Sequence, residues 1–338
     1  MKHRVAVLGG GTWGATLAAH LANVGHDVAI WEFVPEVADH LAKQRSLKTL
    51  PQLRLTDSIL VSNDMGQVLD GRSTILSVTP SHAVRPTFLA AVKTGKLQQG
   101  ATIISASKGI ENKTFLVMTQ IVSEIFPDAG DLAVLTGPSH AEEVAEGQPV
   151  ALVAACASTK GQAHVKDLFT AERFRVYTSP DVLGAQLGAA LKNVYAVACG
   201  IVDGLGLGDN TKAALMTRGL AEMARLGVAM GARPVTFFGL SGLGDLIVTC
   251  GSKHSRNRSL GEKVGQGKTL KQALAEMTMV AEGVNATEST QNLLSVKRVE
   301  MPIVTEVFKV LFENKPPRDS IRDLMSRNVG LEMEGIAL

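Results

Sequence analysis

The chain has 338 residues, of which 45% are hydrophobic and 4% aromatic, and its formal net charge is +2. This length allows roughly two domains with a sizeable core, and the near-balanced charge argues against extended nucleic-acid binding. Cys156, Cys199 and Cys250 lack close metal-ligand spacing, and no other feature predicts a metal site. The N-terminus enters a strand without a signal-peptide pattern, so we expect a soluble, reduced, cytoplasmic protein.

Apolar runs alternate with helical patterns through the first half of the chain, which is typical of a parallel sheet covered by helices. The expected strands are residues 4–8, 27–31, 59–61, 74–78, 102–105, 132–136, 150–154 and 173–177. The expected helices are residues 14–24, 34–43, 82–92, 114–125 and 141–146. We therefore predict an α/β domain over residues 1–179.

A glycine-rich turn follows the first strand, where Gly9, Gly11 and Gly14 form a Gly-x-Gly-x-x-Gly motif before a small-residue helix. Gly9 permits the tight turn, Gly11 lets the backbone approach a pyrophosphate, and Gly14 allows close packing of helix on strand. The free N–H groups of that helix face the anion. An ordinary glycine-rich turn is the alternative, but the flanking elements favour a dinucleotide site in a Rossmann-type domain.

Glu32 ends the second strand, where dinucleotide-binding domains usually contact the adenine ribose. An acid there accepts hydrogen bonds from the 2′-hydroxyl of NAD, and no Arg or Lys occurs between Glu32 and Lys43 to hold the 2′-phosphate of NADP. A solvated loop acid is the alternative. The residues thus favour NAD and leave the choice of cofactor open.

Small polar residues follow three later strands, at the edge where a parallel sheet binds ligands, and the first of these turns is Pro80-Ser81-His82. Lys108 follows the second of these strands and is either a ligand-binding residue or a solvated surface lysine. Gly137, Ser139 and Ala141 follow the third and open a helix whose N-terminus can meet an anion.

Beyond Pro180 the sequence is rich in Ala, Leu, Met and Gly without a clear strand, so we predict an all-helical domain over residues 180–338. Its most apolar stretch, residues 184–202, contains Gln186, Lys192 and Asn193, which argues against a membrane span. We expect residues 322–338 to form a final helix with a loose end.

Polar residues in this half of the chain are candidates for acid–base catalysis and for substrate binding. Lys192 lies in an apolar helix, and burial would suit it to acid–base catalysis near neutral pH, unless it extends to the surface. Asp245 lies among apolar residues and glycines and needs a partner, most simply a lysine or substrate hydroxyls. Ser255, Arg256 and Asn257 either hold a phosphate monoester or form an exposed basic loop.

Together these motifs resemble the NAD(P)-dependent glycerol-3-phosphate dehydrogenases of bacterial type. The resemblance extends from Val5 to Met325 and rests on residues 9–14, 80–82, 107–110, 137–143, 191–193, 242–250 and 255–258, in that order. Gly10 departs from the family, where alanine or proline is common. Glu32 and Phe33 also depart, because many bacterial relatives carry a basic residue or histidine there.

The resemblance implies a fold like that of 6-phosphogluconate dehydrogenase, with the active site in the cleft between domains. It implies reversible oxidation of sn-glycerol 3-phosphate to dihydroxyacetone phosphate with NAD or NADP. Lys192 would then accept and donate the proton at the C2 oxygen of the substrate, and Asp245 would orient the ammonium group of Lys192. The implied substrate contacts are Lys108, Gly137, Ser139, Asp245, Ser255, Arg256 and Asn257. The implied cofactor contacts are Gly9, Gly11, Thr12, Trp13, Gly14, Glu32, Phe33, Lys108, Ala141, Arg256, Val280 and Glu282.

The resemblance further implies a cytoplasmic homodimer, assembled through its substrate and dimerisation domain, that supplies glycerol phosphate for phospholipid synthesis. We expect a small phosphate substrate, no nucleic acid and no stable membrane insertion. Two other functions remain open. One is a related dehydrogenase of hydroxy or sugar acids, which the phosphate-type donors disfavour. The other is a non-catalytic dinucleotide sensor, which the lack of a basic recognition helix disfavours.

Overall fold

The computed structural model describes residues 2–277, 279–328 and 330. The chain divides into two compact units, one made of Met1–Lys108 and Val117–Val182, the other of Gly109–Leu116 and Leu183–Leu338. The expected boundary after residue 179 lies close to the break after Val182. The segment Gly109–Leu116 groups with the second unit, which the sequence analysis did not predict.

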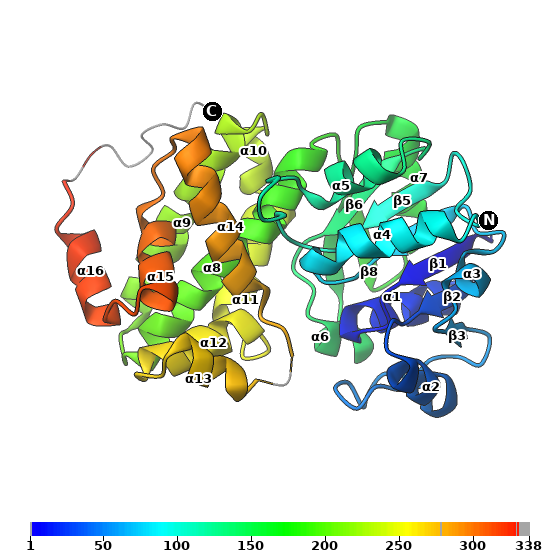
Figure 1. The fold of residues 1–338 in the computed structure, drawn as a ribbon, viewed down its shortest axis with the longest axis horizontal. Coiled ribbons are helices and arrows are strands. Elements are labelled where there is room, and N and C mark those ends of the chain that lie inside the picture. The colour runs from blue at the N-terminus through cyan, green and yellow to red at the C-terminus, as the bar shows by residue number, and fades with distance from the viewer. Residues whose placement is uncertain (1, 278, 329, 331–338) are drawn as a thin grey trace. The chain divides into compact units, whose positions relative to one another are not determined.

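An eight-stranded sheet forms the centre of the first unit, in the order β3-β2-β1-β4-β5-β6-β7-β8 (Figure 1). Its strands are β1 (Arg4–Leu8), β2 (Asp27–Trp31), β3 (Leu60–Ser62), β4 (Thr74–Ser77), β5 (Thr102–Ser105), β6 (Leu132–Thr136), β7 (Val150–Cys156) and β8 (Phe174–Ser179). Residues 5–8 of β1 are all buried, because helices cover both faces of the sheet and the strand needs no polar side.

One pair of strands corrects the expectation of a parallel sheet, because β6 and β7 are antiparallel whereas all other pairs are parallel. A parallel return requires a crossover of a dozen or more residues, usually a full helix. The connection between β6 and β7 contains only the five-residue helix α6 (Ala141–Ala145). The chain therefore returns from the edge at which β6 ended.

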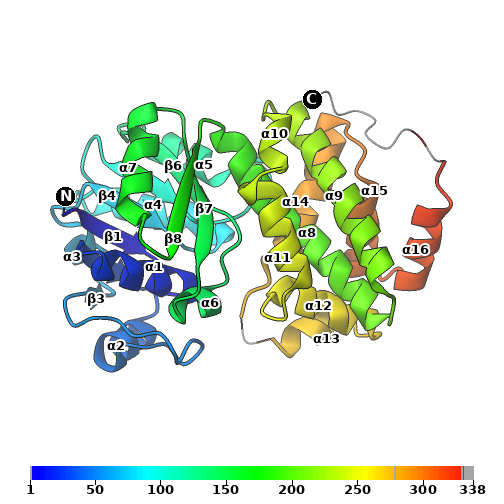
Figure 2. The same cartoon turned by 180° about the vertical axis from the view of Figure 1, so that it is seen from behind.

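The other helices of the first unit lie in two layers. They are α1 (Thr12–Asn23), α2 (Pro35–Gln44), α3 (Met65–Leu69), η1 (Ser81–Ala83), α4 (Val84–Lys93), α5 (Met118–Ile125) and α7 (Thr159–Phe169). Helix α4 packs on α5 at the front of Figure 1, and α1 packs on α7 at the front of Figure 2. The sequence analysis missed α3 and α7.

The helix expected at residues 114–125 begins only at Met118. Lys113 and Phe115 have φ angles of 79° and 60°, which no right-handed helix accommodates. These positive angles belong to the segment Gly109–Leu116 that groups with the second unit.

The second unit contains no β-strand from Leu183 to the last described residue. Its helices are α8 (Val182–Gly204), α9 (Asp209–Ala229), α10 (Pro234–Phe237), η2 (Leu240–Gly244), α11 (Asp245–Gly251), α12 (Arg256–Gly265), α13 (Leu270–Ala275), α14 (Glu282–Lys297), α15 (Pro302–Phe312) and α16 (Pro317–Met325). The expected final helix is α16, which begins before Arg322. The loose end expected after it falls mainly outside the described residues.

Helix α8 is the core of this unit, because every residue from 184 to 202 is buried. Glycines allow its neighbours to approach. A Cβ at Gly188 would lie 2.5 Å from the main-chain oxygen of Ser241, and one at Gly200 would lie 2.0 Å from that of Arg258. By length and composition α8 and the interrupted stretch Pro234–Gly251 could each cross a membrane, but the apolar window of α8 is wholly buried, as in a core helix.

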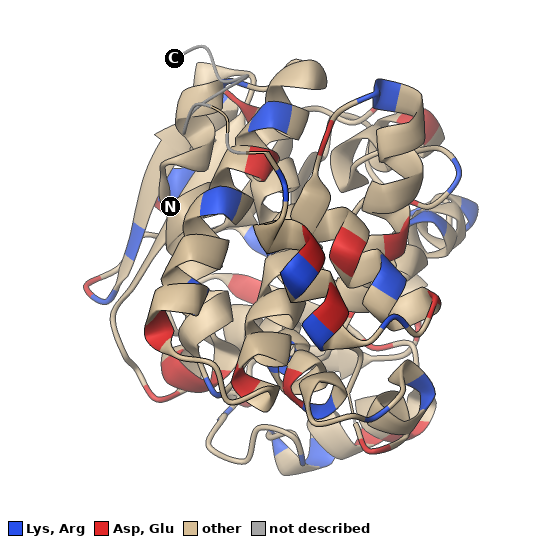
Figure 3. Cartoon of the chain, turned by 90° about the vertical axis from the view of Figure 1, so that its left-hand side faces the viewer, with Lys and Arg blue, Asp and Glu red and all other residues tan. Residues whose placement is uncertain are grey.

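Acidic and basic residues alternate along the helices of the second unit that face the viewer in Figure 3. Several of them form ion pairs, such as Lys309 with Glu306 and Lys315 with Asp323. Such interspersed charges are typical of a solvent-exposed helical surface.

Candidate active site

The turn between β1 and α1 has the backbone that the glycine motif predicts. Gly9 has a φ of +115°, and a Cβ at Gly14 would lie 1.9 Å from the main-chain oxygen of Gly9. A Cβ at Gly11 would meet no atom within 4 Å, so the turn has open space on that side. Helix α1 then begins at Thr12 and Trp13 without a side-chain cap, which leaves its first N–H groups to an outside acceptor.

Two buried hydroxyls lie at the same edge of the sheet. Thr79 follows β4 and Thr136 ends β6, and the Oγ1 atom of each lacks a hydrogen-bond partner within the described part of the chain. A buried polar atom without a partner costs about 1–3 kcal/mol, so such atoms are found where a ligand or water completes them. The open turn and these hydroxyls fit a dinucleotide.

Glu32 lies against the glycine turn. Its Oε2 accepts a hydrogen bond from Gly10 N at 3.0 Å, and its Oε1 accepts one from Val34 N at 3.1 Å. Phe33, next in the chain, is 76% exposed and makes an edge contact with Trp31. An exposed ring beside a fixed carboxylate suits the adenine and ribose of a dinucleotide.

The remaining predicted residues of the first unit follow β5 and β6. Lys108 is half-buried after β5, and Gly137, with a φ of +137°, follows β6. Ser139 donates a hydrogen bond from Oγ to the main-chain oxygen of Gly137 at 2.9 Å, and Ala141 begins α6. Strands β1, β4, β5 and β6 are parallel, so these residues share the sheet edge of the glycine turn.

In the second unit the structure brings Lys192 and Asp245 together. Lys192 on α8 forms an ion pair with Asp245, the first residue of α11, and the two residues are 5% and 1% exposed. The partner that the sequence analysis expected for Asp245 is therefore present. A carboxylate paired with a buried lysine stabilises its ammonium form and also fixes the direction of the ammonium group.

Thr249 completes this group, and the sequence analysis assigned it no role. Its Oγ1 accepts a hydrogen bond from Lys192 Nζ at 2.8 Å and donates its own hydrogen to the main-chain oxygen of Asp245 at 2.6 Å. Helix α11 directly follows the π-helical turn η2, and Thr249 lies one turn after Asp245 on it. Thr249 lies in the motif of residues 242–250 that carries the family resemblance, four residues after the buried acid.

Asn257 connects three elements of the second unit. Its Nδ2 donates to Oδ1 of Asn193 at 2.9 Å, and its own Oδ1 accepts from Gly283 N at 2.8 Å. Asn193 follows Lys192 on α8, and Gly283 lies in the first turn of α14. Asn257 therefore holds the backbone of the site, and direct substrate contact by its side chain stays a prediction.

The other predicted residues of this unit surround the start of α12. Ser255 is the N-cap and accepts a hydrogen bond from Arg258 N at 3.2 Å. Arg256 is exposed and donates from Nη1 to the main-chain oxygen of Val280 at 3.2 Å, and Glu282 begins α14. The guanidinium and the first N–H groups of α12 form a donor set suited to a phosphate.

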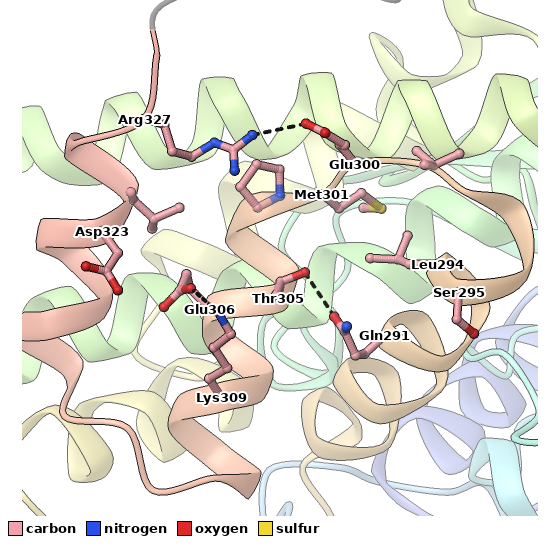
Figure 4. Close-up of a pocket in the computed structure, with 13 residues that line it drawn as sticks. Gln291, Leu294, Ser295, Glu300, Met301, Thr305, Glu306, Lys309, Asp323 and Arg327 are labelled. Atoms are coloured by element: carbon pink, nitrogen blue, oxygen red, sulfur yellow. Dashed lines mark hydrogen bonds and ion pairs between the residues drawn. The ribbon is translucent and has the colours of Figure 1, made fainter.

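A hollow of about 530 Å³ lies elsewhere in the second unit, between α14, α15 and α16 (Figure 4). Its polar side chains satisfy one another, with Arg327 pairing with Glu300 and Thr305 with Gln291. No residue predicted for the active site lines it. The hollow is therefore separate from the group around Lys192.

The chain is similar to known proteins along almost its whole length. The family models described as NAD-dependent glycerol-3-phosphate dehydrogenase N-terminus and C-terminus match residues 4–162 and 181–322. A relative from Geobacter sp. (strain M21), named glycerol-3-phosphate dehydrogenase, NAD(P)+, is 47% identical over 339 residues, covering 99% of this chain and 100% of its own. One from Salinibacter ruber is 44% identical over 327 residues, covering 96% and 95%.

A solved structure agrees with these relatives. The glycerol-3-phosphate dehydrogenase of Coxiella burnetii has a TM-score of 0.93 at 33% sequence identity, covering 96% of this chain and 99% of its own. The chain therefore resembles these proteins both in sequence, along almost its whole length, and in fold. The chain belongs to the family of NAD-dependent glycerol-3-phosphate dehydrogenases.

Proposed function

We propose that the protein catalyses the reversible oxidation of sn-glycerol 3-phosphate to dihydroxyacetone phosphate with NAD or NADP. When bound, the nicotinamide would supply the hydride acceptor for oxidation at C2 of the alcohol and the hydride donor for the reverse reaction. The first unit binds the dinucleotide through the glycine turn, the start of α1 and the edge residues Lys108, Gly137, Ser139 and Ala141. The second unit binds and activates the phosphorylated substrate, and Arg256, Val280 and Glu282 add to the cofactor site.

The observation that carries this proposal is the buried group of Lys192, Asp245 and Thr249. In the reducing direction the ammonium of Lys192 donates a proton to the C2 oxygen and stabilises its developing negative charge. Asp245 and Thr249 fix the direction of the ammonium, because each accepts one of its hydrogen bonds. In the oxidising direction neutral Lys192 accepts the hydroxyl proton.

The phosphate of the substrate binds at the start of α12. Arg256 provides a guanidinium, and Ser255 is the N-cap of α12. A phosphate dianion bound at this helix start would therefore interact with a positive charge and with N–H groups of the helix. Binding a group remote from C2 positions the reacting carbon. Asn257 supports this arrangement through Asn193, and contacts of Lys108, Gly137 and Ser139 to the substrate are part of the same proposal.

The test is oxidation of NADH and NADPH by the purified protein in the presence of dihydroxyacetone phosphate. Dihydroxyacetone without phosphate, a 3-hydroxy acid and a sugar acid are the comparison substrates. We expect turnover with the phosphorylated ketone and little with the others. Turnover of an acid instead, or of no substrate, would contradict the proposal.

We also propose that the enzyme works in the cytoplasm as a homodimer, without stable membrane insertion, and supplies glycerol phosphate for phospholipid synthesis. The family resemblance supports these points. Sedimentation of the purified protein tests the dimer, and fractionation of the producing cell tests the location. A monomer at micromolar concentration, or recovery in the membrane fraction, would contradict them.

A further inference from the structure

Gly10, in the glycine turn, and Glu32, directly after β2, contact each other in the structure. A Cβ at Gly10 would lie 3.0 Å from Oε2 of Glu32 and 3.1 Å from its Cβ. A larger residue at position 10 would therefore force the Glu32 side chain to shift from this place by at least a few tenths of an ångström. The missing side chain of Gly10 leaves the room that Glu32 occupies.

The carboxylate is fixed at this place by main-chain donors. Gly10 N donates to one oxygen at 3.0 Å and Val34 N donates to the other at 3.1 Å. A carboxylate has about four lone-pair sites, so two remain able to accept ribose hydroxyl donors. Hydrogen bonds to an ionised acceptor are stronger than those between neutral groups.

The surroundings supply no positive partner. Within the described residues Glu32 makes no ion pair, and no Lys or Arg occurs between it and Lys43. Helix α2, which follows, adds Glu36 and Asp39. A phosphate on the 2′-oxygen would therefore be repelled by a fixed negative charge. The N–H of Val34 at the start of α2 already donates its hydrogen bond to Glu32, so it is not available to such a phosphate.

We propose that Gly10 and Glu32 form a selective ribose site that makes this enzyme specific for NAD over NADP. This inference rests on the proposed dinucleotide site and names its cofactor. Glu32 accepts a hydrogen bond from the 2′-hydroxyl of the adenine ribose and repels a 2′-phosphate. Gly10 keeps the carboxylate against the turn through its main-chain N–H. Like charges a few ångströms apart near a protein surface repel by an energy that corresponds to roughly tenfold in affinity or more.

The experiment measures dissociation constants of NADH and NADPH by calorimetry on the full-length protein without substrate. We expect wild type to bind NADH at least about tenfold more tightly than NADPH. In Glu32→Gln the charge is lost with little change of shape, and in Glu32→Ala the N–H groups of Gly10 and Val34 become available to a phosphate. Both variants should lower the preference at least about tenfold.

Three further variants separate this mechanism from a general effect. Glu36→Gln removes a nearby exposed charge and should leave the preference unchanged, and Phe33→Ala should weaken both nucleotides alike. Gly10→Ala should reduce the preference as Glu32→Gln does, and the double variant should show no added loss, because both changes act on one contact. Thermal unfolding of each variant verifies that it is folded.

The outcomes distinguish the two proposals. Equal affinity of wild type for both nucleotides, or an unchanged preference in both Glu32 variants, overturns the selective ribose site and leaves the dehydrogenase intact. Binding of neither nucleotide overturns both. A tenfold loss of preference in the Glu32 and Gly10 variants, with Glu36→Gln unchanged, supports the proposal.

Discussion

Tyr195 on α8 donates its phenolic hydrogen to Oε2 of Glu222 on α9 at 3.1 Å, and both side chains are buried. Glu222 also accepts from Ile303 N at 2.9 Å at the start of α15. Burial raises the pKa of Glu222 from 4.5 to about 7, although these hydrogen bonds oppose the shift, and burial also raises the pKa of Tyr195 well above its usual value. The pair therefore links three helices through a carboxyl group that favours its neutral form.

This raised pKa predicts that Glu222 makes the protein less stable as the pH rises. A carboxyl group with a higher pKa in the folded state binds more protons when folded, so its contribution is complete below pH 4.5 and is lost by about pH 7. A difference of this size corresponds to about 3 kcal/mol. Urea unfolding of wild type and Glu222→Gln at several pH values measures it. The stability of the variant relative to wild type should increase between pH 4.5 and 7, and a constant difference would contradict the assignment.

Lys192 and Asp245 predict different results for single and double substitution. Lys192→Met leaves the buried carboxylate of Asp245 without its positively charged partner, which costs roughly 3–5 kcal/mol of stability, whereas the double variant with Asp245→Asn recovers much of this loss. Both should have a kcat lower by about 10² to 10⁴, because the proton donor is absent. Kinetics, urea unfolding and nucleotide calorimetry measure these effects together. Near-normal turnover in the double variant would remove Lys192 from the mechanism.

The sequence predicted the sheet well because its signal is local. Most strands of the first unit are short apolar runs, and the observed bounds differ from the expected ones by a few residues at most. The direction of β7 could not be predicted, since Val150–Cys156 is apolar in either orientation and the short α6 decides it. Helix α7 was missed because Gly161 and its polar residues hide the helical pattern.

The candidate site was partly predictable for a similar reason. Lys192 and Asp245 are charged residues in apolar segments, which is visible in the sequence, and their pairing follows from the need of each for a partner. Thr249 and Asn193 lie in motifs that carry the family resemblance, but they are neutral, so their chemistry alone predicted no role for them. The contact of Gly10 with Glu32 joins two residues on different elements and required the three-dimensional structure.

Arg256 predicts a change in substrate affinity without a change in stability. Its side chain is exposed, so Arg256→Ala should alter the free energy of unfolding by less than about 0.5 kcal/mol. Loss of a charged contact to phosphate should raise KM for glycerol 3-phosphate roughly 10- to 100-fold. Steady-state kinetics at saturating nucleotide test this, with Arg256→Lys as the conservative comparison. An unchanged KM would contradict the phosphate role.

Asn257 predicts the opposite balance. Asn257→Ala leaves Oδ1 of Asn193 and N–H of Gly283 without their partner inside the protein, at about 1–3 kcal/mol each. We expect a lower midpoint of thermal unfolding and a lower kcat, because Asn193 adjoins Lys192. Asn257→Asp keeps the acceptor for Gly283 but loses the donor to Asn193, so it should be intermediate in stability. A variant as stable as wild type would show that Asn257 does not hold these elements together.

Histidines near the start of β1 predict a loss of stability in acid. His164 contacts the ring of His3 at 4.9 Å and lies within 3.4 Å of Thr74 Oγ1, and His3 also contacts His26. Burial, with a smaller effect of neighbouring positive charge, lowers the pKa of His164 and His26 below 6.5, although Asp131 and Asp167 oppose this for His164. These groups are neutral when folded, so their contribution is complete above pH 6.5 and is lost as the pH falls below it. Urea unfolding between pH 7.5 and about 5 should show His164→Gln losing less stability than wild type. His40→Gln, on α2, is the control, and equal losses in wild type and His164→Gln would exclude the cluster as the cause.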